Sequence, residues 1–182
     1  MNYNNVMIDI ETLGVDPTSC ILSIAAVYFD PATGSTGNTF HEYIDLQSCL
    51  DLGMTINAST FIFWMNQNDE ARSQFNQCKK ENIKLVLTQL YDFLKDDQNI
   101  IWANSPSFDC AILKSAYKKS FNCEPRWKYY NERDLRTLTN LFPLEEIELD
   151  ISGIQKGNHN ALNDCYYQIQ LLSAIYNRNI LK

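Results

Sequence analysis

The sequence predicts an α/β protein with a mixed β-sheet flanked by helices. Three observations support this class. Within the first 46 residues, apolar side chains recur with the period of a strand, whereas later segments show helical spacing. One short apolar segment of strand length lies between two of the helical segments. The expected sheet therefore combines an antiparallel meander of three strands with parallel strands.

The three strands of the meander are expected within residues 4–46. Residues 6–11 alternate between two sets of side chains, as in a strand with two different faces. Residues 20–29 form an almost unbroken apolar run, which is typical of a central strand. Turn-forming residues follow at 30–34, and alternation resumes through residues 40–46.

Helical spacing predicts most of the remaining elements. Helices are expected over residues 57–65, 69–77, 81–95, from a Ser107 cap through Tyr117, over 134–141 with Pro143 ending the helix, and over about 160–177. A strand is expected over residues 99–103, and residues 120–133 read as irregular.

The composition indicates one folded domain spanning residues 1–182. The chain is 45% hydrophobic and 20% charged, which is typical of a globular protein that can bury a core. No apolar run approaches the roughly 20 residues of a membrane helix, and the polar start lacks the features of a signal peptide. We therefore expect a soluble, cytoplasmic protein with no membrane partner. Its six cysteines are expected to be reduced thiols without a metal.

Charge is distributed unevenly along the chain. Residues 1–71 contain nine acidic residues and no Lys or Arg, whereas residues 72–136 contain 12 of the 15 basic residues. Two explanations of this uneven distribution stay open. The charged residues of both segments can simply be exposed to solvent. Alternatively, the acidic segment can bind a cation and pack beside a basic surface that binds a polyanion.

Asp9 and Glu11 form the first chemical signal. Residues two apart on a strand share a face, so both carboxylates project to the same side. Such a pair requires a neutralising cation, and oxygen ligands favour Mg²⁺ or Mn²⁺. Asp-x-Glu pairs also arise by chance, but this one ends an apolar strand and precedes Thr12, Leu13 and Gly14.

Two further acids and a histidine follow in the chain. Asp109 lies in the first turn of a helix just after a strand, where α/β sites gather, although an acid there also suits the helix dipole. Asp164 lies near the start of the last helix, where it can enter a buried site. His159 precedes that helix after the tract 156–158 and can accept a proton from water. A lone histidine is more often an exposed or hydrogen-bonded residue.

Together, the Asp-x-Glu pair, the strand-end Asp and the His-x4-Asp pattern resemble the DEDDh 3′–5′ exonucleases, a family with the ribonuclease H-like fold. The resemblance extends from Met7 to about Tyr176. Several segments are similar to the phage DexA-like exonucleases and their bacterial exoribonuclease relatives. They are residues 8–14, residues 24–30 with Thr33 and Gly34, Thr60 with Trp64 and Gln67, and Phe108 with Asp109.

The resemblance implies a two-metal hydrolysis that releases nucleoside 5′-monophosphates. Asp9, Glu11 and Asp164 would hold one Mg²⁺ or Mn²⁺ ion, and Glu11 would touch a second with help from Asp109. His159 would deprotonate the attacking water. Two divalent ions and one general base together meet the needs of phosphodiester hydrolysis.

The resemblance also implies a narrow pocket for the terminal nucleotide. Thr12, Leu13 and Gly14 would approach its sugar and base. Trp64 and Phe108 are candidates for stacking on the base, with core packing an equally weighted alternative for both, while core packing is favoured for Phe63. The candidates for upstream phosphate contacts are Lys114, Lys118, Lys119, Arg126, Lys128, Arg133 and Arg136.

The leading hypothesis is an exonuclease acting on single-stranded 3′ ends, with DNA slightly preferred over RNA. An exoribonuclease that trims short RNA or RNA tails is the alternative. A nucleic-acid-binding domain without turnover is a distant third, because all five catalytic positions are occupied by suitable residues. A homodimer is also expected from the resemblance, as is residence in the host cytoplasm if a phage encodes the chain.

Overall fold

A mixed five-stranded sheet forms the centre of the protein, in the order β3-β2-β1-β4-β5. The computed structural model describes residues 3–76, 79–142 and 159–179. β2 is antiparallel to its neighbours β1 and β3, whereas β4 and β5 run parallel to β1. This arrangement confirms the fold class predicted from the sequence.

The elements follow one another in nearly the predicted order. The strands are β1 (Asn5–Thr12), β2 (Ile21–Phe29), β3 (Thr36–Tyr43), β4 (Ile100–Ala103) and β5 (Glu132–Asp134). The α-helices are α1 (Leu46–Asp51), α2 (Ala58–Met65), α3 (Asp69–Arg72), α4 (Ile83–Leu94), α5 (Asp109–Phe121), α6 (Leu135–Leu141) and α7 (Ala161–Asn179). Two 3₁₀ helices are η1 (Ser73–Asn76) and η2 (Tyr129–Asn131).

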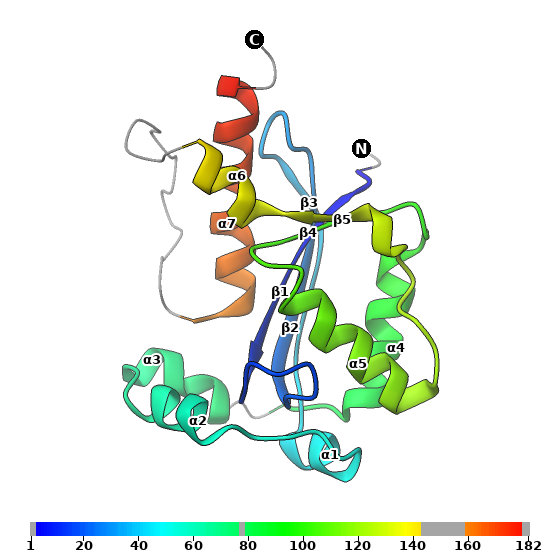
Figure 1. The fold of residues 1–182 in the computed structure, drawn as a ribbon, viewed down its shortest axis with the longest axis vertical. Coiled ribbons are helices and arrows are strands. Elements are labelled where there is room, and N and C mark those ends of the chain that lie inside the picture. The colour runs from blue at the N-terminus through cyan, green and yellow to red at the C-terminus, as the bar shows by residue number, and fades with distance from the viewer. Residues whose placement is uncertain (1–2, 77–78, 143–158, 180–182) are drawn as a thin grey trace.

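Helices cover both faces of the sheet (Figure 1). α4 and α5 lie on one side, α7 lies on the other with α6 beside it, and α2 and α3 lie near the end of β1. None of the helices in the described ranges is long and apolar enough to cross a membrane.

Alternation along β1 divides its side chains between two cores. Val6 and Ile8 belong to the cluster that includes residues of α4 and α5, whereas Met7 belongs to the cluster formed with α7. Because side chains two apart on a strand share a face, Asp9 and Glu11 project to the α7 side. The packing of α7 therefore determines what meets these two carboxylates.

Several local features differ from the expectation. Leu46 begins α1 instead of ending the third strand. Residues 120–133 are not all irregular, because η2 and the start of β5 lie there. β5 is short and charged, so its pairing with β4 defines it and apolar periodicity cannot reveal it.

The helix start at Asp109 also differs from the prediction. α5 has no side-chain cap, and the hydroxyl of Ser107 lies 3.0 Å from that of Ser105. The predicted helix over residues 69–77 is divided into α3 and η1. Residue 77, Pro143 and the tract 156–158 lie outside the described residues.

The described cysteines form no disulfide with one another. They are Cys20, Cys49, Cys110, Cys123 and Cys165. Cys78 lies outside the described residues.

Tyr117 links α5 to α4 within the core, and its loss should be measurable. Its side chain is 1% exposed, and its hydroxyl donates a 2.7 Å hydrogen bond to the carbonyl of Leu87. Tyr117→Phe keeps the ring and removes the donor, so we expect the free energy of unfolding to fall by about 1 kcal/mol. Urea denaturation measures this change. Tyr129→Phe, at a residue 76% exposed, is the control and should not shift the midpoint; equal midpoints for both variants would contradict the prediction.

Candidate active site

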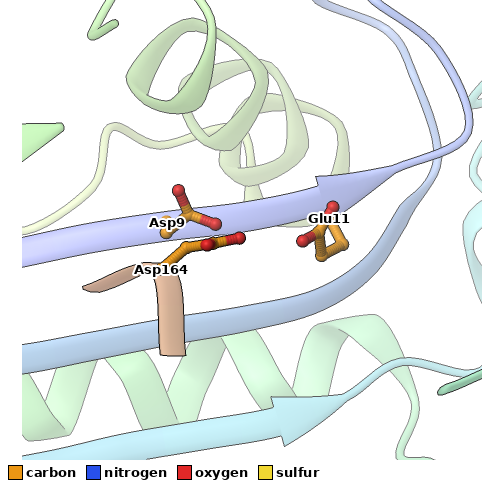
Figure 2. A group of neighbouring side chains, drawn as sticks. All are labelled: Asp9, Glu11 and Asp164. Atoms are coloured by element: carbon orange, nitrogen blue, oxygen red, sulfur yellow. The ribbon is translucent and has the colours of Figure 1, made fainter. Parts of the chain in front are cut away.

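Three carboxylates meet where β1 passes the start of α7. Oxygen atoms of Asp9, Glu11 and Asp164 all lie within 4.8 Å of one another. Figure 2 shows Asp9 and Glu11 along one strand, with the Asp164 side chain reaching toward both from α7. The strand period aligns the first two, and the first turn of α7 supplies the third.

Asp109 approaches the same site from the other side of the sheet. It is the first residue of α5 and is 4% exposed. Its Oδ1 accepts a 3.3 Å hydrogen bond from the backbone N–H of Ile10, which lies between Asp9 and Glu11 on β1. The strand that carries two of the acids thus also holds the fourth.

A cavity of about 200 Å³ brings the five predicted catalytic residues together. Its lining includes Asp9, Glu11, Asp109, His159 and Asp164. The roles of these residues stay predictions, but their convergence in one hollow makes the site chemically coherent.

His159 enters this cavity from a constrained backbone position. Its φ angle is +47°, in the left-handed region, which costs a non-glycine residue roughly 1–2 kcal/mol. Its ring makes edge-type contacts with Phe63 and Trp64, at centroid distances of 5.1 and 5.8 Å. These contacts with α2 orient the imidazole at the mouth of the site.

Burial and mutual repulsion both raise the pKa values of the carboxyl groups. Burial, then the charges of Asp164 and Asp109, raise the pKa of Glu11 to about 8. Burial raises the pKa of Asp109 to about 7, although backbone N–H groups and Arg136 oppose the shift. The pKa of Asp9 is raised well above its usual range, first by burial and then by the other acids. Without a cation, the site therefore retains protons near neutral pH.

Gln168 is a site residue that the sequence prediction missed. Its side-chain nitrogen donates a 2.8 Å hydrogen bond to Oδ1 of Asp9, and the residue is 6% exposed. This bond orients the carboxylate and lowers its pKa against the effect of burial. A polar residue on the buried face of the last helix, one turn after Asp164, was the available signal.

A second, more apolar cavity of about 370 Å³ adjoins the first. Ile10, Glu11 and Phe108 line both cavities. The remaining residues lining the second cavity are Thr12, Gly14, Val15, Ser59, Thr60, Phe63 and Trp64. An apolar cavity beside an acidic one is the arrangement expected for a site that binds a nucleoside next to its phosphate.

The structure corrects the expected positions of two residues around this cavity. Leu13 is 1% exposed and packs in the core, while its backbone N–H and carbonyl bond to Cys20 and Asn57. Its side chain therefore cannot approach a nucleotide as expected. Phe63, for which core packing was favoured, is instead 42% exposed and lines the cavity.

Trp64 lies deeper than a stacking residue should. Its side chain is 2% exposed, and its indole N–H donates a 2.8 Å hydrogen bond to the carbonyl of Thr12. The ring thus fastens α2 to the end of β1 instead of presenting an open face. Phe108 is partly buried and borders both cavities, so it keeps the position expected of a stacking candidate.

Gly14 permits the close packing of the loop after β1. A Cβ atom there would lie 2.4 Å from Oγ of Ser19 and 3.3 Å from Cβ of Asn57. The Thr12 hydroxyl donates a 2.6 Å hydrogen bond to the Gly14 carbonyl. Only glycine lets this loop sit so close to the segment that enters α2.

The donor set fits a hard divalent cation. The three neighbouring carboxylates offer only oxygen atoms as ligands. The raised pKa of Glu11 reflects burial and then repulsion by the other acids, and a bound cation would offset that repulsion. A larger cavity, of about 560 Å³, lies near the opposite end of β1 and includes Tyr3, Tyr28 and Asn99. Asp96 is the one acidic residue among those lining it, beside Lys95, so the cluster of carboxylates that suits a cation is in the smaller cavity.

Comparisons with known proteins agree with this geometry. A protein-family model described as "3'-5' exoribonuclease Rv2179c-like domain" matches residues 4–176. An exodeoxyribonuclease of Enterobacteria phage T4 is 24% identical over 201 residues, covering 91% of this chain and 86% of the phage protein.

Solved structures of E. coli exonuclease I share the fold. A zinc-bound complex with single-stranded DNA matches with a TM-score of 0.72 and 18% identity, and a complex with a dT13 oligonucleotide matches with a TM-score of 0.70 and 17% identity. In both comparisons 99% of this chain is covered, but the chain spans only 42% of the exonuclease I chain. Together with the family match, these likenesses confirm the resemblance to the DEDDh exonucleases. The chain belongs to the Rv2179c-like 3′–5′ exoribonuclease domain family.

Proposed function

We propose that this protein is a metal-dependent exonuclease that shortens single-stranded nucleic acid from the 3′ end. The observation that carries the proposal is one acidic cavity lined by four carboxylates and a histidine. The adjoining apolar cavity supports it, because a terminal nucleoside would fit beside its scissile phosphate. The products would be nucleoside 5′-monophosphates.

Two divalent cations, Mg²⁺ or Mn²⁺, would complete the site. Asp9, Glu11 and Asp164 would hold the first, as their mutual spacing supports. Glu11 would also touch the second, with Asp109 helping directly or through a water molecule. Such ions supply charge stabilisation for the phosphate and the leaving oxygen.

His159 would act as the general base. It would accept a proton from the water whose oxygen attacks phosphorus, and the bond between phosphorus and the 3′ oxygen would break. The shortened strand would then end in a 3′ hydroxyl. The contacts of His159 with Phe63 and Trp64 support this role, because a base must be held in line with its water.

DNA is the proposed preferred substrate, and RNA is the alternative. The phage relative is an exodeoxyribonuclease, which favours DNA. The family description is of an exoribonuclease, which favours RNA. Discrimination would depend on contacts with the 2′ hydroxyl in the apolar cavity, which Ser59 and Thr60 line. The Ser59 hydroxyl donates a 2.6 Å hydrogen bond to Oδ1 of Asn57, so it would serve as an acceptor. A homodimer is proposed from the resemblance alone.

Cleavage should require both the metal and Asp109. We expect 5′-labelled single-stranded DNA to shorten from its 3′ end with Mg²⁺ or Mn²⁺ and to stay intact with EDTA. Asp109→Asn should reduce the rate by at least about 100-fold, because it removes a charge at the reaction centre. RNA of the same sequence, assayed in parallel, identifies the preferred sugar. Cleavage that persists in EDTA or at the wild-type rate in the variant would refute the metal mechanism.

His159→Ala should separate proton transfer from metal binding. We expect the rate to fall by roughly 100- to 10,000-fold, the range typical of a lost general base. The affinity for Mn²⁺, measured by calorimetry without nucleic acid, should stay near that of the wild-type protein. A parallel loss of Mn²⁺ affinity would show that His159 is a metal ligand.

The raised pKa values predict an unusual pH dependence of stability. Glu11, with a pKa of about 8, and Asp109, with a pKa of about 7, bind protons in the folded state that the unfolded chain has released above pH 4–5. Their contribution to stability therefore falls as pH rises from about 5 to 8. In EDTA, Tm should decrease more over this range for the wild-type protein than for Glu11→Gln. An equal decrease would contradict the prediction, and added Mg²⁺ should raise Tm more at pH 8 than at pH 5.5.

A further inference from the structure

Arg136 is the basic side chain that lines the acidic cavity. It lies in the first turn of α6, immediately after β5. Its backbone N–H is 3.2 Å from the carbonyl of Asn104 and 3.0 Å from Oδ1 of Asp134. These bonds place the start of α6 against the β4–α5 loop, which leads to Asp109.

Most other candidate phosphate contacts are engaged elsewhere in the protein. Lys114 pairs with Glu132, Lys128 pairs with Asp97, Lys119 bonds to the Gly53 carbonyl, Arg126 bonds to the Tyr91 carbonyl and covers its ring, and Arg133 bonds to the carbonyls of Tyr130 and Glu132. By contrast, the Arg136 guanidinium makes no hydrogen bond or ion pair with any residue in the described ranges, and the residue is exposed. Its five N–H donors are therefore available to a ligand.

Electrostatics distinguishes a ligand-binding role from a purely structural one. Arg136 lowers the pKa of Asp109, but it does not form the two-point pair that a guanidinium makes with a carboxylate when it neutralises one. Two divalent ions would balance the four acids of the cavity, so a phosphodiester entering it would bring an uncompensated negative charge. A planar guanidinium is well suited to that charge.

We propose that Arg136 binds a phosphodiester group of the substrate strand at the acidic cavity. This inference rests on the proposed exonuclease function and specifies which basic residue meets the nucleic acid backbone. The contact is with phosphate, so it serves DNA and RNA alike and contributes no base preference.

The test compares Arg136→Gln with Lys95→Gln. Lys95 is an exposed residue that lines the larger cavity near the opposite end of β1, and it is not among the candidate phosphate contacts. Both variants remove one positive charge, but only the first removes it from the acidic cavity. Arg136→Lys keeps the charge and loses the paired donors, so it should be intermediate.

Steady-state cleavage of single-stranded DNA at several salt concentrations gives the first readout. For Arg136→Gln we expect KM to rise about 10- to 100-fold, the effect of a lost charge-assisted hydrogen bond, with kcat changed less than threefold. The slope of log kcat/KM against log salt should become shallower by about 0.7, which corresponds to one phosphate contact on a single strand. Lys95→Gln should leave KM unchanged. Equal effects of the two variants, or a loss confined to kcat, would overturn the inference.

Two measurements without turnover keep the test independent of the proposed activity. The anisotropy of a fluorescent single-stranded 10-mer in EDTA should show weaker binding for Arg136→Gln than for Lys95→Gln. The Mn²⁺ affinity of Arg136→Gln should equal or exceed that of the wild-type protein, because a cation near Asp109 has been removed. Weaker Mn²⁺ binding would assign Arg136 a structural role and overturn the inference.

If the wild-type protein cleaves nothing while the anisotropy difference holds, the proposed function fails and the phosphate contact stands. If the wild-type protein cleaves the strand and the two variants bind it equally, the proposed function stands and the phosphate contact fails.

Discussion

Repulsion among buried carboxylates is the constraint on which the rest of this structure depends. Asp9, Glu11 and Asp164 are held within 4.8 Å of one another, and Asp109 lies in the same small cavity. Left alone, such a group favours protonation or separation, and the raised pKa values express that tendency. The free energy that holds the acids together must come from outside the site. Two hydrophobic clusters, one on each face of the sheet, provide it through the packing of α4, α5 and α7.

The protein arranges its compensating contacts without neutralising the acids. Gln168 donates a hydrogen bond to Asp9, and the backbone of Ile10 donates one to Asp109, so both carboxylates are oriented by neutral donors. Arg136 supplies positive charge at the edge of the cavity without forming a two-point pair. This pattern keeps the oxygen atoms available to cations, which an ion-paired network would not.

Apolar periodicity is sufficient to predict the four strands β1 to β4 and the helix α7, because their apolar residues follow strand or helix spacing. The five residues that line the cavity were indicated by the order and spacing of the acids and the histidine, matched to the pattern of the DEDDh exonucleases. β5 could not be predicted, because only its pairing with β4 distinguishes its charged residues from a loop. Spacing also cannot show how deeply an aromatic side chain lies. Phe63 is therefore exposed where core packing was favoured, and Trp64 is buried where stacking and core packing were weighted equally. Leu13 likewise turns into the core, where hydrogen bonds of its backbone N–H to Cys20 and of its carbonyl to Asn57 hold it. The role of Gln168 could not be predicted, because its contact with Asp9 depends on which side chains of β1 face α7.

The separation of the acids along the chain has a consequence for biosynthesis. β1 carries two carboxylates within the first dozen residues, but the third comes from α7, more than 150 residues later. Chains emerge from the ribosome at about 5–20 residues per second, and their amino-terminal parts fold first. A nascent chain therefore contains most of the sheet well before it has a complete acidic site. The group of three carboxylates would therefore be complete only when α7 docks, after the residues that precede it have been synthesised.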